Sequence, residues 1–183
     1  VFINTKEENR FKLTAEELRA AITPKTKMLV LPYPNNPTGA VMTKSDLEAI
    51  AEVLRGTDIM ILSDEIYGEL TYGFDHTSIA SIDGMHERVI LASGFSKAYA
   101  MTGWRMGYLC APAELARQML KVHQYAIMCA PTTSQYAAVE ALEHESLPVM
   151  SVQWHPERMM QDPKQRGLFE TFVQYAAGNK VLD

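Results

Sequence analysis

Short apolar runs alternate with helix-forming segments over most of this chain, and this alternation limits the possible folds more than any other feature. Runs at 28–31, 59–62 and 89–92 predict three strands, and residues 106–111 predict a fourth. Strands that are apolar along their whole length are typical of a parallel sheet with both faces covered. We therefore predict an α/β fold with three layers: a mostly parallel sheet, helices on both of its faces, and residues 28–31 buried on both sides.

Capping signals indicate where the helices begin. Thr14 with Glu17, and Thr43 with Asp46, have the spacing of a capping box, in which two side chains satisfy free backbone amides at a helix start. Prolines at 112 and 131 mark two further helix starts. We expect helices over residues 14–22, 43–55, 112–128 and 132–142.

Composition argues against several classes of function. The 183 residues are 47% hydrophobic and 21% charged, which is usual for a globular protein. The net charge of -5 includes no basic block, so we expect no nucleic-acid partner. No apolar run approaches the roughly 20 residues that cross a bilayer, so we expect no membrane partner. Cys110 and Cys129 lie in apolar surroundings, which predicts buried, reduced thiols of a cytoplasmic protein and no metal site.

Polar residues follow the predicted strands at similar places. Three polar residues each follow a different apolar run by two to five positions. They are Asn36, Asp64 and Lys97. Because ligands of parallel sheets bind outside the carboxyl ends of the strands, we expect these side chains to share one rim. A lysine amine there can lose its proton through desolvation and form a Schiff base with an aldehyde cofactor. Tyr67 and Arg105 add a hydroxyl and a cation nearby in the sequence.

Three segments in this order resemble the fold-type I, class I/II aminotransferases, which depend on pyridoxal 5'-phosphate. They are Asn-Asn-Pro-Thr-Gly at 35–39, Ser-Asp-Glu-Ile-Tyr at 63–67, and Ser-Lys at 96–97 with Gly-Trp-Arg-Met-Gly-Tyr at 103–108. The resemblance covers about residues 2–141. It implies a truncated large domain over residues 1–141 and a cis peptide bond before Pro37.

The resemblance also implies roles for the matching positions. Lys97 would carry the cofactor as a Schiff base and then move the substrate proton. The other cofactor contacts would be Asp64 at the pyridine nitrogen, Asn36 and Tyr67 at the phenolic oxygen, and Ser96 and Arg105 at the phosphate. Gly94 departs from the pattern, because many relatives have a hydroxyl residue there, so Ser93 or Ser96 would replace it.

Membership of this family would imply transfer of an amino group between an amino acid and a 2-oxo acid. The related β-elimination of sulfur amino acids, a C–S lyase reaction, begins with the same proton abstraction and stays open as an alternative. Intact members are homodimers of about twice this length. Because the chain begins at Val1 and lacks the family's small domain, we read it as a fragment with impaired activity of its own.

Residues after about 140 resemble a different family. Gln-Trp-His-Pro-Glu at 153–157 is similar to the last catalytic segment of class I glutamine amidotransferases and gamma-glutamyl hydrolases, where a histidine base has an orienting carboxylate. We expect a strand over 149–154, a following helix, and a vestigial pair of His155 and Glu157 without the cysteine nucleophile. We predict a second domain over residues 142–183. The presence of this tail adds two alternatives for the function of the chain: a remnant of an amide hydrolase, or a non-catalytic chimera.

Overall fold

The structure is a computed structural model that describes residues 1–142. It contains one compact unit over Val1–Cys129 and a second over Ala130–Asp183. The predicted strand at 149–154 and the predicted pair His155 and Glu157 lie outside the described residues.

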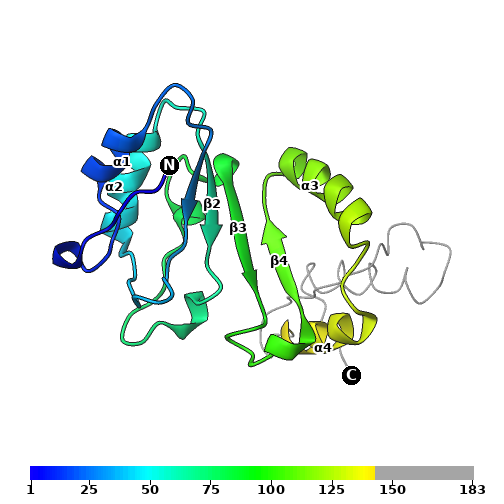
Figure 1. Cartoon of the computed structure of the whole chain (residues 1–183). Helices are drawn as coiled ribbons and strands as arrows, with labels where there is room; N and C mark the ends of the chain where they lie inside the picture. Colours follow the sequence, from blue (N-terminus) through cyan, green and yellow to red (C-terminus); the bar gives the residue numbers. More distant parts are fainter. Residues whose placement is uncertain (143–183) are drawn as a thin grey trace, which may run out of the picture. The chain divides into compact units, whose positions relative to one another are not determined.

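A four-stranded sheet forms the centre of the first unit (Figure 1). Its strands are β1 (Met28–Leu31), β2 (Met60–Asp64), β3 (Val89–Gly94) and β4 (Gly107–Cys110), in that spatial order. The first three are parallel, and β4 is antiparallel to β3. The connection from β3 to β4 holds only a short 3₁₀ helix, and an antiparallel return needs no crossover helix. The predicted mostly parallel α/β fold is confirmed.

Both capping boxes form as the spacing predicts. Thr14 Oγ1 accepts from the Glu17 amide at 3.2 Å, and Glu17 Oε2 accepts from the Thr14 amide at 3.0 Å. Thr43 and Asp46 make the equivalent pair. The α-helices are α1 (Ala15–Ala21), α2 (Lys44–Leu54), α3 (Ala113–Ala126) and α4 (Thr132–Leu142). The 3₁₀ helices are η1 (Glu7–Asn9), η2 (Gly68–Leu70), η3 (Ile79–Ser81), η4 (His86–Arg88) and η5 (Thr102–Trp104).

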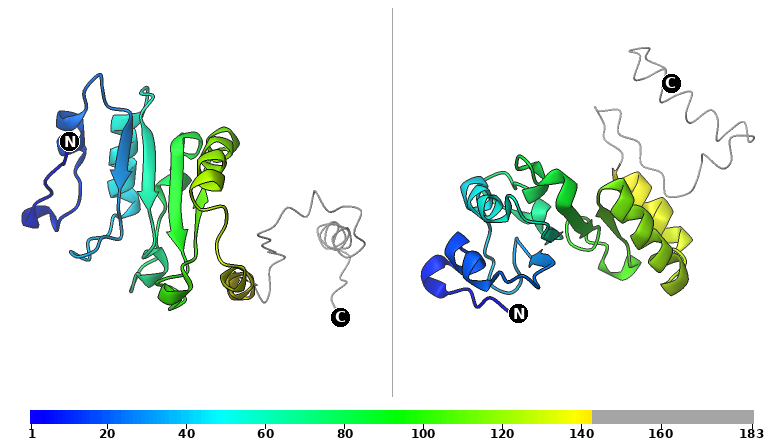
Figure 2. Two further views of the ribbon diagram at one scale, coloured as in Figure 1. Left: turned by 45° about the vertical axis from the view of Figure 1, so that its right-hand side comes forward. Right: turned by 90° about the horizontal axis from the view of Figure 1, so that it is seen from above.

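The core lies where α1 and α2, which run side by side in Figure 2, pack against the sheet. Leu18 of α1 and Leu47, Ile50 and Leu54 of α2 join alternate strand residues in one buried cluster. On β1, Leu29 and Leu31 are buried, whereas Met28 and Val30 are 45% and 56% exposed. The prediction that β1 is buried on both faces was therefore wrong, because within residues 1–142 the helices cover only one face of it.

The predicted burial of the two cysteines was also wrong. Cys110 and Cys129 are both exposed free thiols. All of β4 is exposed, and α3 contains no buried residue, so apolar neighbours in the sequence do not become a core there. Among the described residues, no helix is long and apolar enough to cross a membrane. The same residues contain no cluster of side chains suited to a metal ion.

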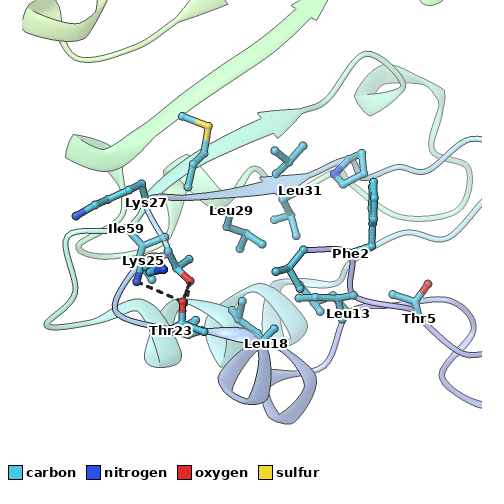
Figure 3. A pocket seen from close by; sticks show the side chains of 18 of the residues that line it. Phe2, Thr5, Leu13, Leu18, Thr23, Lys25, Lys27, Leu29, Leu31 and Ile59 are labelled. Atoms are coloured by element: carbon cyan, nitrogen blue, oxygen red, sulfur yellow. Dashed lines mark hydrogen bonds between the residues drawn. The ribbon is translucent and has the colours of Figure 1, made fainter.

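A hollow of about 710 Å³ lies between α1, β1 and the first residues of the chain (Figure 3). Its lining is mainly apolar and includes Leu13, Leu18, Leu29 and Leu31. The hydroxyls of Thr23 and Thr26 beside it lie 3.4 Å apart. None of the six predicted cofactor residues lines this hollow, so it belongs to the packing of α1 rather than to the predicted rim.

We expect Gly94→Ala to destabilise the protein by about 1–3 kcal/mol, because an added methyl group has no space there. A Cβ atom at Gly94 would lie 2.8 Å from Gly107 Cα and 2.9 Å from the Met106 carbonyl oxygen. Gly103→Ala is the matched control, since a Cβ atom there meets nothing within 4 Å. Urea unfolding measures both, and equal stability of the two variants would contradict the close approach of β3 and β4.

We expect Asp46→Asn to lower the free energy of unfolding at pH 7 by roughly 1 kcal/mol. Burial alone would raise the pKa of Asp46, but hydrogen bonds from Lys12 (2.6 Å) and from Thr43 outweigh it and lower this pKa. A lowered native pKa stabilises the fold above the unfolded value of about 3.9, and the effect is lost as the pH falls through the native pKa. The difference between the native protein and the variant should therefore narrow below about pH 4.

Asp75→Asn is the control for that measurement, because Asp75 is exposed and makes no ion pair with any described residue. Urea titrations at several pH values test the prediction. A difference between the native protein and Asp46→Asn that stays constant down to pH 2 would contradict the role of the carboxylate charge.

Candidate functional site

The parallel strands bring the predicted polar residues to one rim of the sheet. Strand register pairs Leu31 with Ser63 and Asp64 with Ala92, so the carboxyl ends of β1, β2 and β3 lie side by side. Asp64 is the last residue of β2, and Asn36 and Lys97 follow in the loops after β1 and β3. Asn36, Asp64 and Lys97 are all exposed, so this rim is open to a ligand.

Tyr67 is the residue that connects the loops after β1, β2 and β3. Its hydroxyl oxygen lies 3.3 Å from Asn36 Nδ2, which donates a hydrogen bond to it. The Nζ atom of Lys97 lies 5.6 Å from the centre of the Tyr67 ring, within the range of a cation–π contact. An amide, a hydroxyl and an amine from three loops therefore converge at one place.

Local hydrogen bonds hold the loop that carries Asn36. The Asn35 amide donates to the Ala40 carbonyl at 2.9 Å, and Asn35 Oδ1 accepts from Thr38 Oγ1 at 2.8 Å. The Asn36–Pro37 bond is cis, as the family resemblance implies, and Tyr33–Pro34 is also cis. This closed turn presents the Asn36 side chain toward Tyr67.

Asp64 lies at the same rim without a direct contact to this group. Its Oδ1 atom accepts a hydrogen bond from the Ile66 amide at 3.2 Å, which fixes the carboxylate at the start of the turn after β2. Within the described residues, its Oδ2 atom has no hydrogen-bond partner. That oxygen is therefore available to a donor on a ligand.

Phe95 anchors the loop that carries Lys97. Its side chain is fully buried and contacts the rings of Tyr99 and Tyr108. Its backbone is bonded on both sides, since its amide donates to the Met106 carbonyl and its carbonyl accepts from the Met101 amide. A buried anchor two positions before Lys97 holds the lysine at the rim while the amine stays exposed.

Ser96 and Arg105 meet through Thr102. Thr102 Oγ1 donates to the Ser96 carbonyl at 2.9 Å, and Arg105 Nη1 donates to the Thr102 carbonyl at 3.0 Å. The Arg105 backbone is left-handed, with φ 56° and ψ 49°. The structure thus links the two predicted phosphate residues in one loop, although their side chains do not bond to each other.

Glu65, for which the sequence pattern predicted no role, is a buried polar residue directly behind this rim. The signal was present in Ser63-Asp64-Glu65, because three polar residues end an otherwise apolar strand. In an extended strand, residues 63 and 65 face the opposite side from residue 64.

Comparison with known proteins agrees with this geometry. The model of the family described as aminotransferase class I and II matches residues 1–165. The chain belongs to this family. It is 51% identical over 144 residues to the aminotransferase YugH of Bacillus subtilis, covering 79% of this chain and 37% of that protein. It is 51% identical over 146 residues to aromatic-amino-acid aminotransferase 2 of Thermococcus litoralis, covering 79% and 38%.

Solved aminotransferase structures share the fold. The aromatic aminotransferase from Pyrococcus horikoshii superposes with a TM-score of 0.74 at 38% identity, over 97% of this chain and 43% of that one. The aspartate aminotransferase from Thermus thermophilus with maleate gives a TM-score of 0.74 at 36% identity, over 94% and 40%. This class I/II chain therefore spans well under half the length of the relatives it matches.

We expect Arg105→Gly to leave the stability of this aminotransferase-family chain unchanged or slightly higher. A left-handed residue with a side chain costs roughly 1–2 kcal/mol, which glycine does not pay. Arg19→Gly is the matched control, because Arg19 is exposed within α1, where glycine costs about 1 kcal/mol. Thermal unfolding compares the two, and an equal loss of stability in both would contradict the left-handed backbone at Arg105.

Proposed function

We propose that this chain is the cofactor-binding part of a pyridoxal-phosphate-dependent aminotransferase, which moves an amino group between an amino acid and a 2-oxo acid. The observation that carries the proposal is the convergence of Asn36, Tyr67 and Lys97 at the strand ends of a chain of this family. An amine alone at a rim is common, but an amine beside a hydrogen-bonded phenol and amide is suited to a carbonyl cofactor.

The chemistry of the donor set fits pyridoxal phosphate. The Asn36 amide and the Tyr67 hydroxyl can both donate to a phenolic oxygen. Asp64 has one carboxylate oxygen directed to no described partner, which suits a protonated ring nitrogen. Arg105 offers an exposed guanidinium to the phosphate, with Ser96 in the same loop. We therefore assign cofactor binding to Asn36, Asp64, Tyr67, Ser96, Lys97 and Arg105.

Pyridoxal phosphate, when bound, supplies the aldehyde that condenses with amines and the ring that withdraws electrons from the substrate. The residues of this chain do the remaining work. Lys97 Nζ is the catalytic base that takes and returns the proton of the substrate α carbon. Asp64 would hold the cofactor by accepting a hydrogen bond from a protonated ring nitrogen, and the bond from Asn36 orients the Tyr67 hydroxyl.

The partners follow from this proposal. The substrates are two small molecules, an amino acid and a 2-oxo acid, and the whole protein is a homodimer. A C–S β-lyase would use the same proton abstraction, but the relatives described above are all named aminotransferases, which favours transamination. Cytoplasmic location stays a prediction from the sequence.

For residues 142–183 we retain the hypothesis of an amidotransferase-like tail with a vestigial His155 and Glu157. It is supported by the sequence resemblance alone, and the aminotransferase match extends through residue 165. The amide hydrolase remnant and the non-catalytic chimera are alternatives that rest on the same resemblance. No described residue favours either of them.

We expect pyridoxal phosphate followed by borohydride to label Lys97 selectively, because that amine lies near the ring of Tyr67, whose hydroxyl is bonded to Asn36. Peptide mass mapping identifies the labelled lysine. Lys97→Ala should remove most of the label, whereas Lys121→Ala, at an exposed position on α3, should leave it unchanged. Equal labelling of several exposed lysines, undiminished in Lys97→Ala, would contradict the proposed site.

A further inference from the structure

A buried carboxylate lies directly behind the candidate site. The Glu65 side chain is only 7% exposed and accepts three hydrogen bonds from side chains. Oε1 accepts from Ser63 Oγ at 2.8 Å and from Ser78 Oγ at 2.7 Å, and Oε2 lies 2.7 Å from His76 Nε2. Burying a carboxylate is unfavourable unless such donors surround it, so this arrangement is a specific one.

The Glu65 backbone is held as firmly as its side chain. Its amide donates to the Ala92 carbonyl of β3 at 2.8 Å. Its carbonyl accepts from the Gly68 amide at 2.8 Å and lies 3.4 Å from Ser93 Oγ. Glu65 therefore joins the end of β2, the end of β3 and the turn that leads to Tyr67.

Because side chains alternate along the strand, the buried position of Glu65 determines the direction of the Asp64 side chain. Ser63 and Glu65 are buried, and Asp64 between them is exposed. A shift of one residue would reverse every side chain, so that Glu65 would reach the rim and Asp64 would be buried. Within residues 1–142, the side chains that donate to Glu65 come from Ser63, His76 and Ser78 on the inner side, and these bonds favour the register in which Asp64 faces outward.

His76 and Ser78 supply those donors from the loop before η3. Because carboxylate oxygens only accept hydrogen bonds, we assign the hydrogen to His76 Nε2. His76 Nδ1 is buried and has no hydrogen-bond partner within residues 1–142, which favours an unprotonated nitrogen there. Ser78 Oγ also accepts from the Ala80 amide at 3.2 Å, so one hydroxyl both caps η3 and contacts Glu65.

The same loop packs against the turn that carries Tyr67. A Cβ atom added at Gly68 would lie 3.1 Å from Cδ2 of the His76 ring. The imidazole thus covers the first residue of η2, immediately after Tyr67. Movement of His76 away from Glu65 would remove support from this turn.

We propose that Glu65 is a positioning residue, which uses His76, Ser78 and Ser63 to hold Asp64 outward and Tyr67 next to Lys97. The effect on cofactor binding rests on the proposed function, whereas the effect on the backbone does not. Glu65 acts through its neighbours, since its side chain lies on the inner side of the strand and does not reach the rim.

Hydrogen exchange of backbone amides tests the structural part without any cofactor. In Glu65→Gln, one donor facing the carboxylate loses its acceptor, and we expect exchange at Ile66, Gly68 and Ala80 to become about tenfold faster. The amide of Met60, at the other end of β2, should change less than twofold. Glu69→Gln is the matched control, because Glu69 is exposed in η2. Equal acceleration at Met60, or no acceleration, would overturn the proposal.

Affinity for pyridoxal phosphate tests the link to the site. At a temperature where the variant is folded, we expect Glu65→Gln to weaken binding about tenfold and the milder Ser63→Ala to weaken it less. Thr43→Ala is a control for stability alone, since it loses a helix cap on α2 but should bind like the native protein. Binding by Glu65→Gln equal to that of Thr43→Ala and Glu69→Gln would overturn the positioning role.

The two measurements separate this inference from the proposed function. If the native chain binds no pyridoxal phosphate, the proposed function fails, and hydrogen exchange alone then decides whether Glu65 holds the turn. If the native chain binds the cofactor and exchange in Glu65→Gln is unchanged, the proposed function stands and the positioning role of Glu65 fails.

Discussion

Parallel pairing of β1, β2 and β3 is the constraint on which the candidate site depends. Because the strands run in one direction, the loops after them start from the same edge of the sheet. Asn36 and Tyr67 are 31 positions apart in the chain and still form a hydrogen bond. Lys97 reaches Tyr67 from a third strand end. Each of the three strand ends contributes at least one side chain, and none of them forms the site alone.

The strands and helix starts could be predicted from the sequence because local patterns determine them. Apolar runs matched β1 to β4 within two residues at either end, and hydrogen bonds between near neighbours formed both capping boxes. The wrong predictions all concerned whether a residue in an apolar segment is buried from solvent. Val30 and Cys110 have apolar neighbours along the chain, but their exposure depends on packing across elements, which periodicity does not contain.

Prediction of the site had the same limit. Residue types and order indicated one rim with Asn36, Asp64 and Lys97, but not that Tyr67 would be the point of contact. Gly94 is the clearest case, since the resemblance marked it only as a missing hydroxyl. The structure gives a physical reason for glycine, because Gly107 of the antiparallel strand β4 approaches so closely that no Cβ atom fits. The antiparallel pairing of β3 and β4 requires this glycine. The connection between these two strands contains both Lys97 and Arg105.

The adjacent carboxylates of Asp64 and Glu65 at the end of β2 have opposite environments, since one is exposed and the other is buried. This difference explains how two neighbouring acidic residues can have different roles at the rim. Glu65 is buried among donors that fix it, while Asp64 is exposed and has one oxygen without a hydrogen-bond partner among the described residues. Exchange of the two roles would remove Glu65 from Ser63, Ser78 and His76, and the shorter side chain of Asp64 would face these donors instead. In the proposed positioning role, the contacts of Glu65 select which acidic residue faces the rim, and the position of Tyr67 three residues beyond Asp64 follows from the same contacts.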